Sequence, residues 1–330
     1  MNISVLGAGS WGIALGEVLD QNGHNVLLWH RNGEFINKIN RHRFHPYFSN
    51  YKLSKNLKFT DSLNLISNHA EILISAIPSQ SLRSVLLKLP KEKYQIIVST
   101  SKGIENETGI RMSEVISQTL NLENKKIVIL SGPSHAEEVI QKYPTAIVSA
   151  STSINNAKYI QKLFSNEYFR VYTASDTIGV EIGGSIKNII SIAAGICSGL
   201  GYGDNTMAAL VTRGSEEIIR LGVAQGAERS TFSGLSGIGD LIVTAFSPHS
   251  RNRQVGERIG SGEILSDIIN DMQMIAEGVE TSRSIISLIE KYQIEMPICK
   301  KIYEVLFEGA KPGDAIQDLM KRELVDEHLI

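Results

Sequence analysis

The sequence places one lysine in surroundings that would alter its chemistry. Lys187 is the only cation in the apolar stretch 186–194, and helical spacing puts Gly183, Gly184, Ser191 and Gly195 on its side of the helix. We interpret this face of small residues as room for a ligand. Loss of water disfavours the ammonium form of a lysine, which suits a general acid or base near neutral pH. The alternative is a lysine that extends along a packed helix to reach solvent.

Two further polar groups follow along the chain. Asp240 comes directly after the glycine-rich stretch 234–239, and its carboxylate could orient Lys187 or a substrate hydroxyl. Ser250, Arg251 and Asn252 supply hydroxyl, guanidinium and amide donors, a set that matches a phosphate group. Taken singly, Asp240 could instead cap a helix and Arg251 could be a solvated cation.

The beginning of the chain has the spacing of an anion-binding turn. Gly7, Gly9 and Gly12 stand between an apolar run and a helical pattern that ends near residue 22, in the order strand, turn, helix. In such a turn the first glycine permits a tight bend, the second lets a pyrophosphate approach the backbone, and the third brings the helix close to the strand. The pattern therefore predicts dinucleotide binding. The alternative is a structural glycine turn in another α/β protein.

The end of the next apolar run indicates which dinucleotide is bound. An NAD site usually has Asp or Glu there to bind the ribose, whereas an NADP site has a cation for the 2′-phosphate. Residues 26–29 are apolar, and the next three are His30, Arg31 and Asn32. Arg31 can pair with a phosphate, so the sequence favours NADP over NAD. The alternative is that Arg31 is a solvated loop residue.

Short β-branched runs must position these residues. We expect further strands at 72–77, 96–99, 127–130 and 146–148, in a mostly parallel sheet covered on both faces. After residue 175 helical patterns take over, with helices expected at 176–200, 207–225, 264–272, 281–292 and 296–307. The predicted fold class is α/β, with an N-terminal Rossmann-like dinucleotide-binding domain at 1–172 and an all-α helical substrate domain at 173–330.

Composition excludes several other classes of protein. The chain has 33 Lys and Arg against 35 Asp and Glu with no block of like charge, which argues against nucleic-acid and membrane-surface roles. We expect no membrane span, because apolar stretches are interrupted early, and no export segment, because only Asn2 precedes the first apolar run. Cys197 and Cys299 lack neighbouring metal ligands, so we expect two buried apolar residues, no metal and a cytoplasmic location.

Seven segments together resemble bacterial NAD(P)-dependent glycerol-3-phosphate dehydrogenase. In chain order they are GAGSWG, STSKGIE, SGPSHAEEV, EIGGSIKNIISIAAGI, GLSGIGDLIVT, SPHSRNR and AEGVET. Each segment alone would also fit other proteins, but the seven together are specific to this family and extend over nearly the whole chain. The resemblance implies reversible hydride transfer between NAD(P)H and the C2 carbonyl of dihydroxyacetone phosphate, giving sn-glycerol 3-phosphate for phospholipid synthesis. It also implies a homodimer.

The resemblance implies roles for single residues by their position. Lys187 takes the place of the catalytic proton acceptor. The implied substrate contacts are Lys102, Gly132, Ser134, Lys187, Asp240, Ser250, Arg251 and Asn252. The implied cofactor contacts are Gly7, Gly9, Ser10, Trp11, Gly12, Arg31, Lys102, Ala136, Arg251, Ile275 and Glu277. Asn188 and Thr244 match positions near the substrate in related eukaryotic enzymes.

Two other functions fit part of the sequence. An NADP-dependent reductase of another short keto or hydroxy acid would share the nucleotide domain and the helical lysine, but the phosphate-matching residues 250–252 argue against it. A non-catalytic NADP sensor would have no reason to place Lys187 among small residues.

Overall fold

The chain divides into two units. The computed structural model describes residues 1–48, 50–91, 93–272, 276–324, 326 and 327. Unit 1 comprises Met1–Lys102 and Ile110–Thr177, and unit 2 comprises Gly103–Gly109 and Ile178–Ile330. The predicted boundary lies between residues 172 and 173, whereas the last strand of unit 1 continues to Ala174. The short segment 103–109 belongs to unit 2 through bonds such as Asn106 Nδ2 to Glu280 Oε2 at 2.9 Å.

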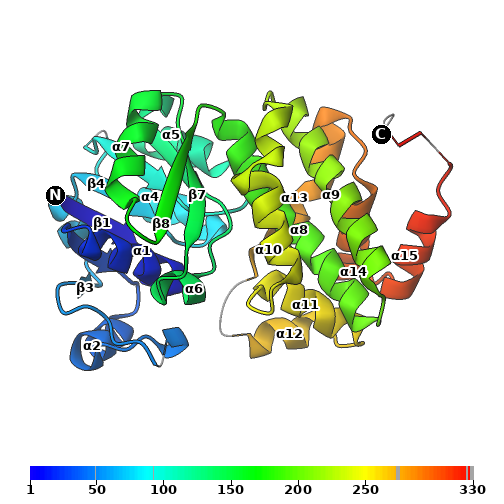
Figure 1. Cartoon of the computed structure of the whole chain (residues 1–330), viewed down its shortest axis with the longest axis horizontal. Coiled ribbons are helices and arrows are strands. Elements are labelled where there is room, and N and C mark those ends of the chain that lie inside the picture. The colour runs from blue at the N-terminus through cyan, green and yellow to red at the C-terminus, as the bar shows by residue number, and fades with distance from the viewer. Residues whose placement is uncertain (49, 92, 273–275, 325, 328–330) are drawn as a thin grey trace. The chain divides into compact units, whose positions relative to one another are not determined.

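Unit 1 is built on one sheet (Figure 1). The described residues form eight strands: β1 (Asn2–Leu6), β2 (Asn25–Trp29), β3 (Lys58–Thr60), β4 (Ile72–Ser75), β5 (Ile96–Ser99), β6 (Ile127–Ser131), β7 (Thr145–Ala150) and β8 (Phe169–Ala174). They lie in the order β3-β2-β1-β4-β5-β6-β7-β8, and only β6 and β7 are antiparallel neighbours. After β1 the chain adds β2 and β3 on one side of that strand, and it then crosses to add β4 on the other side. This reversal marks the carboxyl end of β1 as a ligand-binding position.

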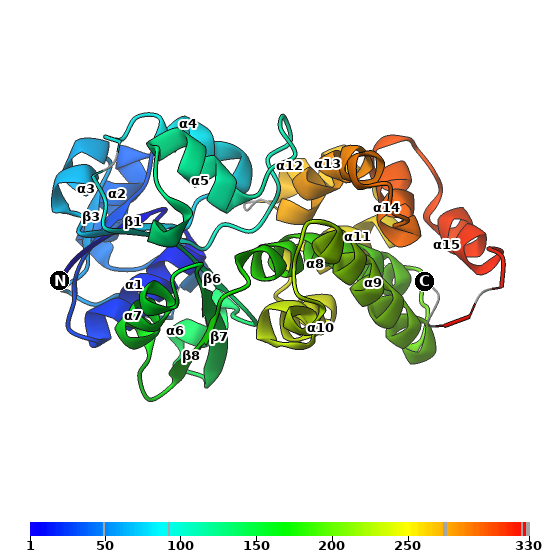
Figure 2. The same cartoon turned by 90° about the horizontal axis from the view of Figure 1, so that it is seen from above.

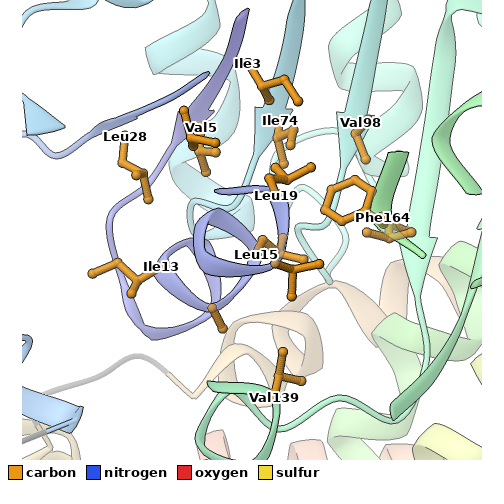
Figure 3. Packing of buried hydrophobic residues seen from close by; sticks show 14 of the residues in the cluster. Ile3, Val5, Ile13, Leu15, Leu19, Leu28, Ile74, Val98, Val139 and Phe164 are labelled. Atoms are coloured by element: carbon orange, nitrogen blue, oxygen red, sulfur yellow. The ribbon is translucent and has the colours of Figure 1, made fainter. Parts of the chain in front are cut away.

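Helices cover both faces of the sheet, as Figure 2 shows. They are α1 (Ser10–Gln21), α2 (Gly33–His42), α3 (Leu63–His69), α4 (Leu82–Leu86), α5 (Met112–Leu120), α6 (Ala136–Ile140) and α7 (Ile154–Phe164). One apolar core joins α1, α6 and α7 to the sheet, and a second core joins α3, α4 and α5 to the opposite face. Figure 3 shows the first core, where Leu19 of α1 lies next to the strand residue Ile74.

The regular elements among the described residues of unit 2 are helices. It contains α8 (Thr177–Gly199), α9 (Asp204–Ala224), α10 (Asp240–Phe246), α11 (Arg251–Gly260), α12 (Leu265–Asp271), α13 (Glu277–Tyr292), α14 (Pro297–Phe307) and α15 (Pro312–Met320). By length and composition α8 could cross a membrane, but 100% of its apolar window is buried inside the protein. It is therefore the central helix of this unit's core.

Glycines let α8 and α11 pack backbone against backbone. A Cβ on Gly195 would lie 2.0 Å from the carbonyl oxygen of Arg253, and one on Gly256 would lie 2.0 Å from that of Ile192. Cys197 and Cys299 are buried, free thiols, and burial raises the pKa of Cys197 to about 11. Both cysteines are the small buried apolar residues that the sequence predicts.

Candidate active site

The three glycines after β1 have different surroundings. Gly7 has a φ of +113°, and a Cβ there would lie 2.4 Å from the carbonyl oxygen of Ala76. A Cβ on Gly12 would lie 1.8 Å from the carbonyl oxygen of Gly7, so α1 passes directly over the turn. A Cβ on Gly9 would meet nothing within 4 Å. The tight bend and the close helix are both present, and the open space beside Gly9 fits a pyrophosphate at the start of α1.

Other predicted cofactor residues lie around this turn. Ser10 is buried and Trp11 is half-buried, and they are the first two residues of α1. Arg31 is exposed just after β2. Next to it, Asn32 Oδ1 accepts from the backbone N–H groups of Glu34 and Phe35 at 2.9 and 3.1 Å, which caps α2. Arg31 is thus at the end of β2, where a cofactor 2′-phosphate is expected.

His45 is buried in the segment after α2, and its Nδ1 accepts from the N–H of Tyr47 at 3.2 Å. No sequence motif points to this residue. Burial lowers the pKa of His45 to about 4, so the ring is neutral at physiological pH.

The turns after β5 and β6 bring together three predicted substrate residues. Lys102 Nζ lies 3.4 Å from the carbonyl oxygen of Gly132, and Ser134 Oγ donates to the same oxygen at 2.9 Å. Gly132 has a φ of +147°, and a Cβ there would lie 2.9 Å from Cα of Ile147. Ala136 is buried at the start of α6. These turns follow the carboxyl ends of adjacent parallel strands, where ligands bind in such sheets.

In unit 2, Lys187 is held by two residues of α10. Its Nζ lies 3.0 Å from Asp240 Oδ1 and also donates to Thr244 Oγ1. The side chains of Lys187 and Asp240 are only 6% and 2% exposed. Thr244 Oγ1 in turn donates to the carbonyl oxygen of Asp240 at 2.6 Å. The lysine is therefore an oriented, ion-paired group. The alternative interpretation, a lysine that extends into solvent, is wrong.

Our interpretation of the glycines near Lys187 was wrong. We expected Gly183 and Gly195 to leave room for a ligand, but backbone from other segments occupies that room. A Cβ on Gly183 would lie 2.6 Å from the carbonyl oxygen of Ser236, and Gly195 packs on α11. The approach at Gly183 brings the 235–239 turn, and with it Asp240, against α8.

Ser191 and Ser250 extend this network to α11. Ser191 Oγ donates to the carbonyl oxygen of Thr244 at 2.7 Å and lies 3.1 Å from Ser250 Oγ. Proline at position 248 has no N–H, so the backbone four residues ahead cannot satisfy that carbonyl. Ser250 is the N-cap of α11 and accepts from the N–H of Arg253 at 3.2 Å.

Asn252 joins α8 to the start of α13. Its Nδ2 donates to Asn188 Oδ1, and its Oδ1 accepts from the N–H of Gly278, both at 2.9 Å. Arg251 and Glu277 are the first residues of α11 and α13. Ile275 lies outside the described residues. Unit 2 thus joins Lys187, Asp240 and Ser250 in one set of polar contacts, through Thr244 and Ser191, and Asn252, Asn188 and Gly278 in a second set.

Fold and site together define the class of protein. Unit 1 has the sheet order and glycine turn of a dinucleotide-binding domain, and unit 2 holds a buried lysine paired with a carboxylate, a group of the kind that transfers protons. This combination is that of a nicotinamide-dependent dehydrogenase.

Comparison with known proteins gives the family. Residues 2–157 match the NAD-dependent glycerol-3-phosphate dehydrogenase N-terminus, and residues 176–317 match the C-terminus of the same family. The chain belongs to this family. Glycerol-3-phosphate dehydrogenase [NAD(P)+] of Carboxydothermus hydrogenoformans is 48% identical over 330 residues, which cover 99% of this chain and 98% of the relative. That of Lysinibacillus sphaericus is 46% identical over 332 residues, covering 98% of both.

A solved structure supports the same assignment. The crystal structure of glycerol-3-phosphate dehydrogenase from Coxiella burnetii has a TM-score of 0.92 and 33% sequence identity, covering 97% of this chain and 98% of that chain.

Proposed function

We propose that this chain catalyses reversible hydride transfer between NAD(P)H and dihydroxyacetone phosphate, giving sn-glycerol 3-phosphate for phospholipid synthesis. The observation that carries the proposal is buried Lys187, held by Asp240 and Thr244 and linked through Ser191 to Ser250 at the start of α11. The names of the relatives support the same reaction.

Lys187 is the proposed proton donor for ketone reduction. When hydride adds to C2, negative charge develops on the carbonyl oxygen, and the ammonium both stabilises this charge and donates a proton to it. In the reverse direction the amine accepts the hydroxyl proton. Asp240 and Thr244 hold the ammonium in place, and the Asp240 carboxylate compensates its charge in a buried setting.

The start of α11 is the proposed phosphate site. α11 has 10 residues, so its first N–H groups and its dipole favour an anion. Arg251 offers paired donors, and Ser250 and Asn252 add hydroxyl and amide groups. Binding energy gained at the phosphate, away from C2, aligns the carbonyl for reaction. Lys102, Gly132 and Ser134 of unit 1 are proposed as further substrate contacts.

The glycine turn is the proposed site for the cofactor, which supplies the hydride when bound. The turn and the first residues of α1 hold the pyrophosphate, and Arg31 pairs with a 2′-phosphate, so NADPH is preferred over NADH. The remaining proposed contacts are Lys102, Ala136, Arg251, Ile275 and Glu277. Because an ammonium supplies the positive charge at the carbonyl oxygen, the chemistry requires no metal.

We extend the proposal to a homodimer in the cytoplasm. The homodimer rests on the family resemblance, and the cytoplasmic location rests on the two buried, free cysteines, which suit a reducing compartment. Sedimentation equilibrium measures the mass in solution, and a mass of one chain at micromolar concentration would contradict the homodimer.

An absorbance assay tests the reaction. We expect the purified protein to consume NADPH when dihydroxyacetone phosphate is added, and to do so with a higher kcat/KM than with NADH. Dihydroxyacetone and pyruvate, which lack the phosphate, should be slower by at least about a hundredfold. Reduction of pyruvate but not of dihydroxyacetone phosphate would instead identify a short keto acid reductase, and NADPH binding without any turnover would identify a sensor.

A further inference from the structure

We propose that Ser191 is a positioning residue for the reaction: it keeps the start of α11, the proposed phosphate site, in register with the proton donor Lys187. This inference rests on the proposed function of these two sites. Sequence spacing marks Ser191 only as a small residue on the face of Lys187, and the family resemblance implies no role for it.

The hydrogen bonds of Ser191 have a defined direction. Its hydroxyl has one hydrogen, which goes to the carbonyl oxygen of Thr244 at 2.7 Å, because a carbonyl can only accept. The contact of 3.1 Å between Ser191 Oγ and Ser250 Oγ is therefore a hydrogen bond that Ser250 donates. Ser250 Oγ also accepts from the N–H of Arg253 at 3.2 Å, so the N-cap of α11 is attached to Ser191.

Ser191 provides a donor for a carbonyl that α10 itself leaves without one. Thr244 lies in the last turn of α10, and the residue four positions later is Pro248, which has no N–H. Ser191 is 0% exposed and Thr244 is 4% exposed, so both residues are shielded from bulk solvent. A buried carbonyl without a donor is costly, and the end of α10 is therefore held at Ser191.

Lys187 and Ser191 hold Thr244 from one side of α8. They are four residues apart on this helix, so they lie one turn apart on the same face. Lys187 Nζ donates to the Thr244 hydroxyl, and Ser191 Oγ donates to the Thr244 carbonyl. Ser191 thus joins the end of α10 and the N-cap of α11 at one point of α8, one turn from the proton donor.

A proton relay through Ser191 is the less suitable explanation. Thr244 Oγ1 donates its hydrogen to the carbonyl oxygen of Asp240 at 2.6 Å, and Ser191 donates its own to the carbonyl oxygen of Thr244. A carbonyl oxygen accepts a hydrogen bond but has no proton to pass on. The contribution of Ser191 is therefore the position of α11 relative to Lys187.

Ser191→Ala tests this proposal with two substrates, dihydroxyacetone phosphate and dihydroxyacetone, which lacks the phosphate. The variant loses both hydrogen bonds of Ser191, so α11 can shift on α8 and move a bound phosphate relative to Lys187. A displacement of about 1 Å can slow a reaction about a hundredfold, so for a smaller shift we expect kcat for dihydroxyacetone phosphate to fall about tenfold, with KM within about threefold of wild type. Dihydroxyacetone is not held at α11, so its kcat/KM should fall less than about threefold.

Ser284→Ala is the matched control, because Ser284 is also buried in unit 2 and its Oγ donates to Asn106 Oδ1 at 2.8 Å. It should lower Tm and leave the ratio of the two kcat/KM values as in wild type. If Ser191→Ala does not fold, Ser191→Cys, whose thiol is a weak donor, gives the same comparison.

Two results would overturn the proposal. Ser191→Ala could slow both substrates by the same factor, or slow neither, and Ser191 would then be a structural residue only. A wild-type protein that does not turn over dihydroxyacetone phosphate would overturn the proposed function and this inference with it, whereas equal slowing of both substrates would overturn the inference alone.

Discussion

Single buried residues of this protein are used for orientation as much as for chemistry. Glu217 is an example outside the proposed site. It lies buried on α9, and its two carboxylate oxygens accept from the N–H groups of Ile298 and Cys299 at 2.7 and 3.0 Å. These are the second and third residues of α14, after Pro297, so Glu217 caps that helix from a neighbouring one.

The burial of Glu217 predicts a pH-dependent stability. Loss of water raises its pKa from the ordinary 4.5 to about 7, although the two backbone hydrogen bonds act in the opposite direction. The folded protein therefore holds the proton more tightly than the unfolded chain. The resulting stabilisation is fully present below pH 4.5 and is lost as the pH rises through about 7.

Glu217→Gln removes this titration. We expect the free energy of unfolding of wild type to fall, relative to that of the variant, by roughly 1–3 kcal/mol between about pH 5 and pH 8. Urea denaturation at a series of pH values measures this difference. Glu216→Gln, one residue earlier and partly exposed, should follow wild type. If the free energies of unfolding of wild type and Glu217→Gln differ by the same amount at every pH, the pKa of Glu217 is the same in the folded and unfolded states, which would contradict the prediction.

At the scale of elements, the turn between β1 and α1 contains one glycine that the fold requires and another that is proposed to make room for the cofactor. Gly12 is needed because α1 touches the carbonyl oxygen of Gly7, whereas nothing within 4 Å surrounds an added Cβ at Gly9. The backbone of Gly9 has a φ of −78°, which any residue can adopt. The same substitution at the two positions should therefore have different consequences.

Gly12→Ala should lower Tm by more than about 10 °C or prevent folding, because helix and strand must separate. Gly9→Ala should change Tm by only a few degrees and raise the Kd of NADPH at least about tenfold, because its methyl takes the space for the pyrophosphate. Thermal melts measure the Tm of each variant, and fluorescence titrations measure its Kd for NADPH. Normal cofactor affinity in Gly9→Ala would place the pyrophosphate elsewhere.

The sequence predicted those elements whose own residues carry a clear apolar pattern. The β-branched runs of β1, β2 and β4–β7 predicted the sheet, and the long apolar period of α8 predicted the main helix. β8 was missed because only alternate residues are buried, with Arg170 and Tyr172 exposed at the edge of the sheet. β3 has only three residues. α10 and α11 are short and separated by Pro248, so their polar residues looked like loops.

At the scale of the whole molecule, the site residues come from distant parts of the chain. Lys187, Asp240 and residues 250–252 could be named from their types, but their contacts could not, because these depend on how α8, α10 and α11 pack. The assignment of residues 103–109 to unit 2 likewise depends on tertiary bonds, such as that of Gly103 to Ser185.

The division into two units predicts that a single substitution can abolish catalysis without weakening cofactor binding. The glycine turn lies in unit 1 and Lys187 in unit 2. A variant that loses the lysine should therefore retain the cofactor. Lys187→Ala leaves Asp240 buried without its cation, which destabilises a folded protein. Lys187→Met combined with Asp240→Asn avoids this charge and serves as the second form of the test.

The most direct measurement is the turnover of Lys187→Ala, and of the neutral double variant, with NADPH and dihydroxyacetone phosphate, next to the Kd of NADPH for each. The account predicts that kcat falls at least about a hundredfold while the Kd of NADPH stays within about threefold of wild type. Turnover above about a tenth of the wild-type value in either folded variant would contradict the account, because Lys187 would then be a packing residue and not the proton donor.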